Sequence, residues 1–223
     1  MPDLPGGMMP RDAINFIKNL TGTGDAEIQK YAREIKSDRR FHARLQQNSG
    51  ESGRKHRYSY WGIGVGSTPA SVIYALCRRQ MPGIVIETGV ASGISSSYFL
   101  AALEKNQKGA LYSIDMPGWQ DVRSGWLIPD YLRPRWHFVL GRSSETLEPL
   151  LEQVGEIDIF LHDSDHSYRN MTWEFQTAWA HLKSGGLLLS HNIDTNSAFE
   201  DFCGRVNQVG QVVDGNTGGL SKP

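Results

Sequence analysis

The chain has 223 residues, 39% of them hydrophobic, which is enough for one full-sized α/β domain with a short extension. Its 23 basic and 24 acidic residues give a formal charge of −1, which argues against a nucleic-acid or anionic-membrane partner bound by bulk electrostatics. A small molecule is therefore the expected partner. The first residues lack the basic-then-apolar order of a signal peptide, and no stretch approaches membrane-spanning length, so we expect a cytoplasmic protein.

The two cysteines, Cys77 and Cys203, lie in different regions and have no metal-ligand spacing. This pattern predicts two buried thiols in a reducing compartment.

Residues 1–57 are polar and helix-prone, with apolar residues such as Ile28, Ile35 and Phe41 spaced as an amphipathic face. We expect an N-terminal helical extension or cap. The stretch Gln47–Gly53 is rich in Asn, Ser and Gly and is predicted to be a loop. It would separate the extension from a main domain at residues 58–223.

From about residue 70, amphipathic helices alternate with apolar runs of four to six residues. This alternation predicts a parallel sheet buried on both faces, and therefore a doubly wound α/β domain. The expected strands are 83–88, 110–114, 136–140, 157–161, 186–190 and 210–214, and the expected helices are 70–79, 95–104, 145–154, 170–182 and 197–206.

Two aromatic-rich segments lie outside this alternation. The connection Met116–Arg135 is long and carries Trp119, Trp126 and Tyr131, so it is either a binding loop or lid, or a packed surface loop. Upstream, residues 58–62 hold Tyr58, Tyr60 and Trp61, which could cover a cofactor or substrate or pack in the core.

Polar residues follow the predicted strands. In open α/β sheets, ligands bind at the carboxyl ends of the strands, near the point where the strand order reverses. In chain order these positions hold Glu87 and Gly89, Asp115, Gly141–Ser144, Asp163, and His191 with Asn192.

The first of these segments suggests a nucleotide-like cofactor. Gly89 and Gly93 let the backbone approach a ligand closely, and Asp115 follows Gly93 by 22 residues (115 minus 93), where an acid typically meets ribose hydroxyls. A dinucleotide would favour Gly-x-Gly-x-x-Gly, whereas three residues separate the two glycines here. Glu87 would also repel a pyrophosphate but would attract an ammonium and a sulfonium.

The segment Val85–Ser95 resembles the first motif of class I S-adenosylmethionine-dependent methyltransferases. The form is similar to that of catechol and caffeoyl-CoA O-methyltransferases and their small bacterial relatives. The similarity extends through Leu111–Asp115, Gly141–Ser144, Phe160–Tyr168 and Gly185–Asn192, and covers roughly residues 58–206. It implies a mostly parallel, seven-stranded, Rossmann-like methyltransferase sheet.

The resemblance also implies residue roles for the cofactor. Glu87 and the following loop would hold the aminocarboxypropyl arm, Asp115 the ribose hydroxyls, and Ser143 and Ser144 would lie by the adenine. Either serine is also a good N-cap for the helix that follows. The loop residues concerned are Gly89, Ala91, Gly93 and Ser95, and Asp163 also borders the cofactor.

A divalent metal is implied by the same resemblance. In related enzymes, an acid after the fourth strand and an Asp-Asn pair after the fifth bind the ion, and Asp163, His191 and Asn192 occupy those positions. Oxygen ligands suit magnesium. His191 stands where the family more often has aspartate, which could shift the preference toward manganese, iron or zinc, or leave a metal-free hydrogen-bonded cluster.

His166, three residues after Asp163, stands where related enzymes place a general base, although it could be a structural histidine. His162 is expected to point into the surroundings of the sheet. The function expected is transfer of the S-adenosylmethionine methyl group to a small-molecule hydroxyl, with His166 and Asp163 as catalytic residues and Mg²⁺ or Mn²⁺ as a candidate cofactor. An NAD(P)-dependent oxidoreductase and a non-catalytic S-adenosylmethionine-binding partner protein are the alternatives. The sequence leaves the acceptor, and whether the protein is a homo-oligomer, open.

Overall fold

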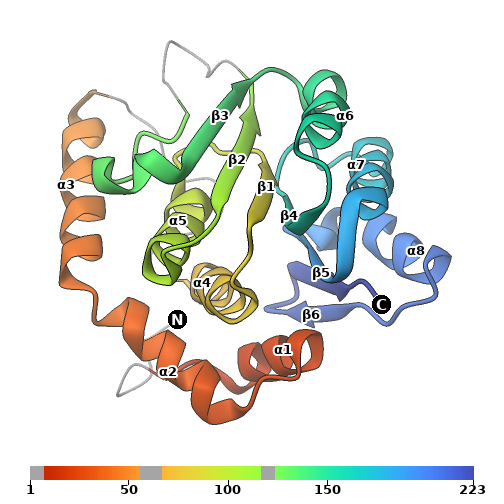
Figure 1. The fold of residues 1–223 in the computed structure, drawn as a ribbon, viewed down its shortest axis with the longest axis horizontal. Helices are drawn as coiled ribbons and strands as arrows, with labels where there is room; N and C mark the ends of the chain where they lie inside the picture. The colour runs from red at the N-terminus through yellow and green to blue at the C-terminus, as the bar shows by residue number, and fades with distance from the viewer. Residues whose placement is uncertain (1–7, 56–66, 117–123) are drawn as a thin grey trace.

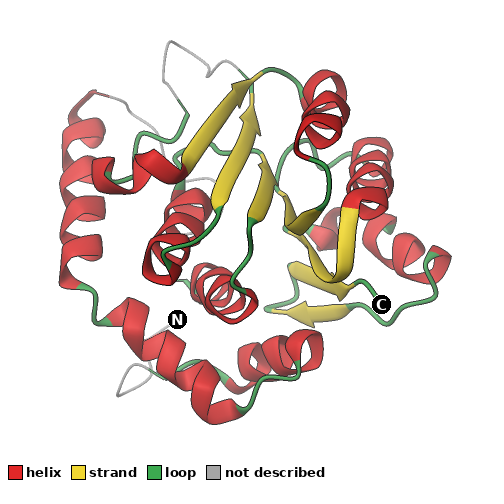
Figure 2. Cartoon of the chain, in the orientation of Figure 1, coloured by secondary structure: helices red, strands yellow, loops and turns green. Residues whose placement is uncertain are grey.

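A central sheet with helices on both faces organises the molecule (Figures 1 and 2). The structure is a computed structural model, and it describes residues 8–55, 67–116 and 124–223. The seven strands are ordered β3-β2-β1-β4-β5-β7-β6, and the first five in the chain run parallel, whereas β7 is antiparallel to both of its neighbours. The predicted doubly wound, mostly parallel sheet is confirmed.

The strands are β1 (Ile84–Thr88), β2 (Ala110–Asp115), β3 (Trp136–Leu140), β4 (Ile157–His162), β5 (Leu182–Ser190), β6 (Gln211–Val213) and β7 (Thr217–Ser221). The helices are α1 (Arg11–Thr21), α2 (Asp25–Lys36), α3 (Arg39–Lys55), α4 (Thr68–Gln80), α5 (Ile94–Asn106), α6 (Ser143–Val154), α7 (Tyr168–His181) and α8 (Ala198–Arg205). Short 3-10 helices occupy η2 (Asp130–Arg135) and η3 (Ile193–Thr195).

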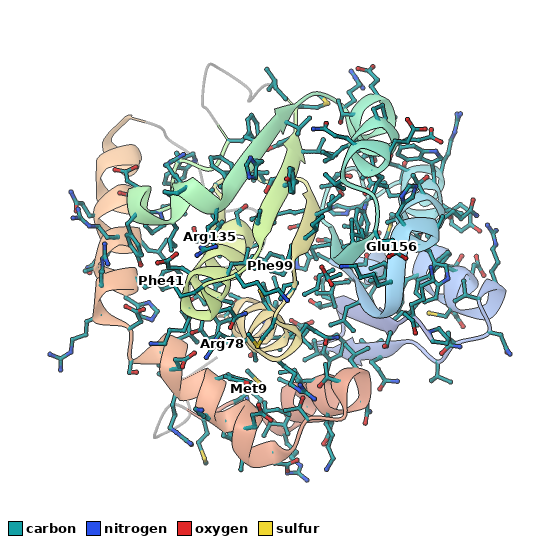
Figure 3. All side chains as sticks on the ribbon, viewed as in Figure 1. Met9, Phe41, Arg78, Phe99, Arg135 and Glu156 are labelled. Atoms are coloured by element: carbon teal, nitrogen blue, oxygen red, sulfur yellow. The ribbon has the colours of Figure 1, made fainter. Side chains whose placement is uncertain are left out.

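Two hydrophobic cores lie on the two faces of the sheet, because successive side chains of a strand point in opposite directions. Val85 and Leu161 belong to the core shared with α1–α5, whereas Ile86 and Phe160 belong to the core shared with α6–α8. Figure 3 shows Phe41 of α3 and Phe99 of α5 on the first side. Both cysteine thiols are buried and free, as predicted.

The N-terminal helices are part of the first core. Arg78 of α4 binds Glu34 of α2 at 2.6 Å (Nε to Oε1), and the same carboxylate oxygen accepts from Tyr74 at 2.6 Å. In Figure 1, α3 runs along one flank of the molecule from α2 toward the edge where the arrows of β2 and β3 end. The boundary expected at residue 57 lies outside the described residues.

The loop predicted at Gln47–Gly53 is wrong, because α3 continues through it to Lys55. Its Asn48 amide donates to the carbonyl oxygen of Leu127 at 3.0 Å. A tertiary contact thus holds a sequence of weak helix formers in the helix.

Strand β7 was missed by the sequence pattern, since its sequence is Thr-Gly-Gly-Leu-Ser. A Cβ at Gly218 would lie 2.7 Å from the ring of Phe199 in α8, and one at Gly219 would lie 2.7 Å from the ring of Phe16 in α1. The glycines therefore let helices pack closely on this strand, which hydrophobic periodicity does not reveal.

The described part of the long connection, residues 124–135, is packed against the first core. Leu127, Ile128 and Leu132 are fully buried, and Trp126 and Tyr131 are partly buried against them. Trp119 and the upstream aromatics Tyr58, Tyr60 and Trp61 lie outside the described residues. Among the described helices, none has the length and apolar character needed to cross a membrane.

Candidate active site at the carboxyl edge of the sheet

The loop after β1 is shaped by two left-handed glycines. Gly89 has φ of +81°, and a Cβ there would lie 2.0 Å from the carbonyl oxygen of Asp163, so only glycine lets the ends of β1 and β4 come this close. Gly93 is the N-cap of α5 and has φ of +88°. A Cβ at Gly93 would lie 2.8 Å from the Cα of Gly125. Ala91 also takes a left-handed conformation, with φ of +46°.

Glu87 lies fully buried at the end of β1, on the face covered by α5. Its carboxylate accepts hydrogen bonds from Ser95, from Ser96 at 2.5 Å and from Ser113 at 2.9 Å. Burial raises its pKa to about 7, against the opposing effect of the serine hydroxyls. The side chain thus joins the first turn of α5 to β2 while carrying a carboxyl group that titrates near neutrality.

Asp115 ends β2 and holds the same loop from the other side. Its Oδ2 accepts from the backbone N–H of Ala91 at 3.0 Å and from the hydroxyl of Ser124 at 2.7 Å. Its Oδ1 accepts from the N–H of Met116 at 2.8 Å. The residue predicted to meet a ribose therefore stands beside the glycine loop, as the motif order requires.

Ser143 and Ser144 form the start of α6, at the end of β3. The predicted N-cap role is wrong for both serines, because Arg142 occupies the N-cap and Ser143 is already helical. Arg142 makes no side-chain cap. Both serines lie at the same edge of the sheet as Gly89 and Asp115, since β1, β2 and β3 are parallel neighbours.

Asp163, His166 and His191 come together after β4 and β5. The ring Nδ1 of His191 lies 3.0 Å from Oδ1 of Asp163, and Nε2 of His166 lies 3.8 Å from the same oxygen. Burial alone would lower the pKa of His191, but the hydrogen bond to Asp163 and its negative charge raise it. For His166, burial outweighs the attraction of Asp163 and lowers the pKa.

Two of the three predicted metal ligands, Asp163 and His191, lie in direct contact. Asp163 and His191 are hydrogen-bonded to each other, and Asn192 follows with a left-handed backbone whose N–H bonds to Asn216 at 3.3 Å. In residues 8–55, 67–116 and 124–223, no three His, Cys, Asp or Glu side chains gather where they could hold a metal ion. The contact between Asp163 and His191 is the hydrogen-bonded arrangement expected as the alternative to a metal site.

Glu174 of α7 is a member of this region that sequence analysis did not find. Its buried carboxylate accepts from Thr88 at 2.6 Å, and its Oε2 lies 2.7 Å from Nδ1 of His162. His162 is fully buried, on the α7 face of the sheet. The signal was present, because Glu174 lies on the apolar stripe formed by Met171, Phe175 and Ala178 of the helix.

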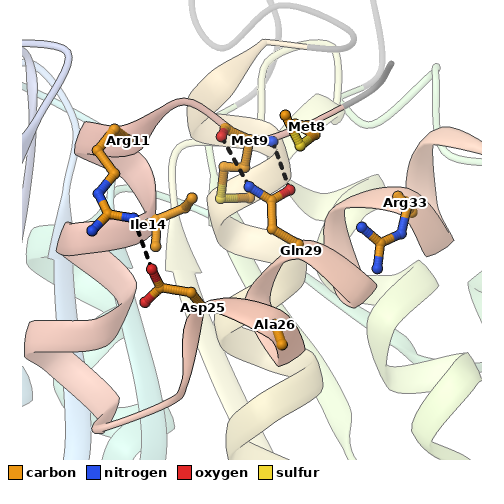
Figure 4. Close-up of a pocket in the computed structure, with 8 residues that line it drawn as sticks. All are labelled: Met8, Met9, Arg11, Ile14, Asp25, Ala26, Gln29 and Arg33. Atoms are coloured by element: carbon orange, nitrogen blue, oxygen red, sulfur yellow. Dashed lines mark hydrogen bonds and ion pairs between the residues drawn. The ribbon is translucent and has the colours of Figure 1, made fainter.

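A pocket of about 580 Å³ lies elsewhere, between α1 and α2 (Figure 4). Arg11 and Asp25 form an ion pair at 2.7 Å on its wall, and Gln29 bonds both backbone groups of Met9. These helices lie at the opposite end of the sheet from the arrowheads of β2 and β3 (Figure 1). The pocket is thus separate from the polar cluster.

Comparison with known proteins identifies a methyltransferase domain around this site. A family model described as a methyltransferase domain matches residues 86–193, which run from β1 to just beyond β5. The match therefore contains the glycine loop, Asp115, Asp163, His166 and His191. No significant match was found among curated proteins.

Solved structures share the fold at low sequence identity. An O-methyltransferase from Bacillus cereus in complex with S-adenosylhomocysteine is 14% identical, with a TM-score of 0.62 over 92% of this chain and 100% of that one. The O-methyltransferase TomG from Streptomyces achromogenes, involved in tomaymycin synthesis and solved with S-adenosylmethionine, is 15% identical, with a TM-score of 0.61 over 81% and 90%. The Podospora anserina methyltransferase PaMTH1, bound to S-adenosylhomocysteine, is 13% identical, with a TM-score of 0.59 over 82% and 87%.

The matched domain, the strand order and the acidic residues near the ends of β1 and β2 all indicate the same kind of site. Residues 86–193 thus match a methyltransferase domain, and the chain shares its fold with solved S-adenosylmethionine-dependent O-methyltransferases.

Proposed function

We propose that the protein transfers the methyl group of S-adenosylmethionine to a hydroxyl of a small molecule, with His166 as the general base. One observation carries the proposal: the loop that would hold the donor and the segment that carries the base are joined through their backbones. The N–H of Asp163 donates to the carbonyl of Thr88 at 2.8 Å, and Gly89 rests against the Asp163 carbonyl. A base thus stands beside the donor loop.

The residues present fit a cationic nucleoside-containing donor. Glu87 and the loop Gly89, Ala91, Gly93 and Ser95 would hold the aminocarboxypropyl arm, and Asp115 would meet the ribose. Ser143 and Ser144 would border the adenine. When bound, S-adenosylmethionine supplies an electrophilic methyl group on a sulfonium. The buried carboxyl of Glu87 supplies the negative charge that a cation favours.

His166 is suited to take a proton at neutral pH. Its side chain is 30% exposed and its lowered pKa keeps the imidazole neutral. The acceptor hydroxyl would give its proton to the ring while its oxygen forms the new bond to the methyl carbon. The carbon–sulfur bond breaks with its electron pair going to sulfur, and Asp163 at 3.8 Å stabilises the imidazolium.

The proposed transfer runs through His166 without a metal ion. The Asp163–His191 hydrogen bond occupies two of the three groups that the resemblance assigned to a metal. We expect turnover to survive treatment with EDTA and to be unchanged by added Mg²⁺ or Mn²⁺. Loss of turnover in EDTA, restored by either ion, would instead support a metal bound by Asp163 and Asn192.

The proposal is tested first by binding and then by turnover. We expect S-adenosylhomocysteine, and not NADH, to raise the melting temperature, which separates a methyltransferase from a dinucleotide oxidoreductase. Turnover is measured as S-adenosylhomocysteine released with a panel of catechols, phenols and sugar hydroxyls. Binding without turnover on any acceptor would favour a non-catalytic partner protein.

His166→Gln should lower kcat by about 10²–10⁴-fold, the range that a general base contributes, and leave the affinity for S-adenosylhomocysteine unchanged. His181→Gln is the matched control, because His181 is half-buried at the C-terminal end of α7, away from Asp163. Equal activity of the two variants would contradict the assignment of the base.

A further inference from the structure

Glu174 and His162 form a buried pair behind the candidate base. Glu174 is fully buried, yet it is surrounded by donors: Thr88 and Ser164, each at 2.6 Å, and the side-chain amide of Asn170 at 3.0 Å. Burial is the largest single effect and opposes ionisation, but the hydrogen bonds from His162 and two serine hydroxyls, together with the charge that the His162 ring carries when protonated, lower the pKa of Glu174. The group is therefore a carboxylate at neutral pH, which can only accept hydrogen bonds.

The carboxylate fixes the proton on His162. Its Oε2 lies 2.7 Å from Nδ1 of that ring, so Nδ1 carries the hydrogen and donates. With Nδ1 as the only N–H of a neutral ring, Nε2 of His162 presents a lone pair. This nitrogen lies 3.3 Å from Nδ1 of His166, with the two ring planes at 80°. Because two lone pairs would repel each other at this contact, Nδ1 of His166 carries the hydrogen.

We infer that Glu174 and His162 are positioning residues that set the tautomer of His166, leaving its Nε2 free to accept a proton. The inference rests on the proposed role of His166 as the base. Nε2 is also the ring atom that faces Asp163 at 3.8 Å. The chain Glu174, His162, His166 thus delivers the lone pair on the side where a developing positive charge would be stabilised.

The pair also has a structural role from which the inference must be separated. Glu174 bonds Thr88 of β1 and His162 of β4, so it ties two strands to α7. A merely structural Glu174 would affect folding stability but not the location of a proton on His166. The tautomer is therefore the discriminating readout.

The tautomer can be read directly by long-range ¹H–¹⁵N correlation spectra of the ligand-free protein labelled with ¹⁵N-histidine. We expect His166 to be protonated at Nδ1, with its signals assigned by their disappearance in His166→Gln. Glu174→Gln should shift His166 toward the Nε2–H form, whereas Glu174→Asp, which keeps the charge, should retain Nδ1–H. Glu152→Gln on the exposed face of α6 is the control. An Nε2–H ring, or a doubly protonated His162, in the unmodified protein would overturn the inference.

A second pair of variants decides the question even if Glu174→Gln does not fold. The amide of His162→Gln can donate to Glu174 and accept from His166, whereas His162→Leu can do neither. We expect His162→Gln to keep the Nδ1–H tautomer and His162→Leu to lose it. The kcat of His162→Leu should be at least about ten-fold below that of His162→Gln, with the KM for S-adenosylmethionine unchanged in both.

Equal tautomers in the two His162 variants would overturn the inference whatever their stability. The spectra also separate it from the proposed function. One outcome would be that no hydroxyl is methylated, while His166 carries its proton on Nδ1 in the parent but not in Glu174→Gln. The positioning role of Glu174 would then stand, and the proposed methyl transfer would be wrong.

Discussion

Two glutamates, Glu87 and Glu174, are equally buried near the ends of neighbouring strands but on opposite faces of the sheet, and their pKa values move in opposite directions. Burial raises the pKa of Glu87 to about 7 because three serine hydroxyls compensate only part of the lost hydration. Burial also opposes ionisation of Glu174, but the hydrogen bonds and charge of its neighbours, with His162 first among them, together lower its pKa. Burial alone therefore does not decide whether a buried glutamate is ionised. The groups that donate hydrogen bonds to its carboxylate decide it as well.

The difference follows the expected use of each group. Glu174 has its charge satisfied within the protein, so it can serve as a fixed acceptor. Glu87 is left with a carboxyl group whose ionisation is unfavourable until a cation approaches. Perturbed pKa values of this kind are typical of functional sites. Three experiments would break or sharpen this comparison.

The largest effect is expected from Glu174→Ala. Removing the carboxylate leaves His162, Asn170 and two hydroxyls facing an empty buried site, and we expect a loss of on the order of 3–5 kcal/mol in the free energy of unfolding at pH 7. Urea denaturation measures it. Glu152→Ala, in an exposed position on α6, should change stability by less than about 0.5 kcal/mol. A similar small loss for Glu174→Ala would show that its hydrogen bonds are not formed.

Glu87→Gln should raise the free energy of unfolding at high pH, whereas Glu174→Ala should lower it. The folded pKa of Glu87 lies above its ordinary value of 4.5, so its contribution to folding stability is fully present below about pH 4.5. This contribution, on the order of 3 kcal/mol, is lost as the pH rises through about 7. Glutamine removes this dependence. We expect the variant to be more stable than the parent at pH 8 and close to it at pH 5, by urea denaturation at both values.

The same substitution at the other glutamate is the internal control. Glu174 has a lowered pKa, so its contribution is present above the ordinary value and is lost as the pH falls through the folded pKa. Glu174→Gln should therefore be less stable than the parent at pH 8. If the two variants shift stability in the same direction at pH 8, the contrast between the glutamates is wrong.

The smallest effect is expected from Ser96→Ala, which removes the hydroxyl that donates to Glu87 at 2.5 Å. We expect a loss of about 1 kcal/mol at pH 8, where Glu87 is ionised, and a smaller loss at pH 5. Ser97→Ala is matched, since the adjacent Ser97 is also buried but donates to the carbonyl of Gly93. The stability loss of Ser97→Ala should be the same at pH 5 and pH 8. A pH-dependent loss in Ser97→Ala would mean that the pH dependence of Ser96→Ala does not report on Glu87.

The sheet was predictable because its strands are short apolar runs buried on both faces. The expected first strand, 83–88, differs from β1 by one residue, and the polar residues that follow the strands do meet at one edge. Glu87, Asp115 and Asp163 could be found because they lie at or next to the carboxyl ends of strands. Their contacts could not be predicted, since the partners Ser113 and Ser124 are specified only by the folded chain.

The failures have physical causes. Helix α3 persists through Gln47–Gly53 because Asn48 bonds the backbone of the long connection, which local propensity does not include. Glu174 was passed over because a single glutamate in a helix is ordinarily a solvated residue. Its position between Met171 and Phe175 on the apolar stripe was the available signal.

The close packing of β7 has a consequence for the order of events in folding. Phe16 of α1 rests on Gly219, and Asn19 of the same helix bonds Gln211 of β6, 192 residues later in the sequence. A helix made early during synthesis therefore cannot reach its final partners until the last hairpin has left the ribosome. Contacts of such long sequence separation slow folding, so we expect the seam between α1 and the β6–β7 hairpin to close late.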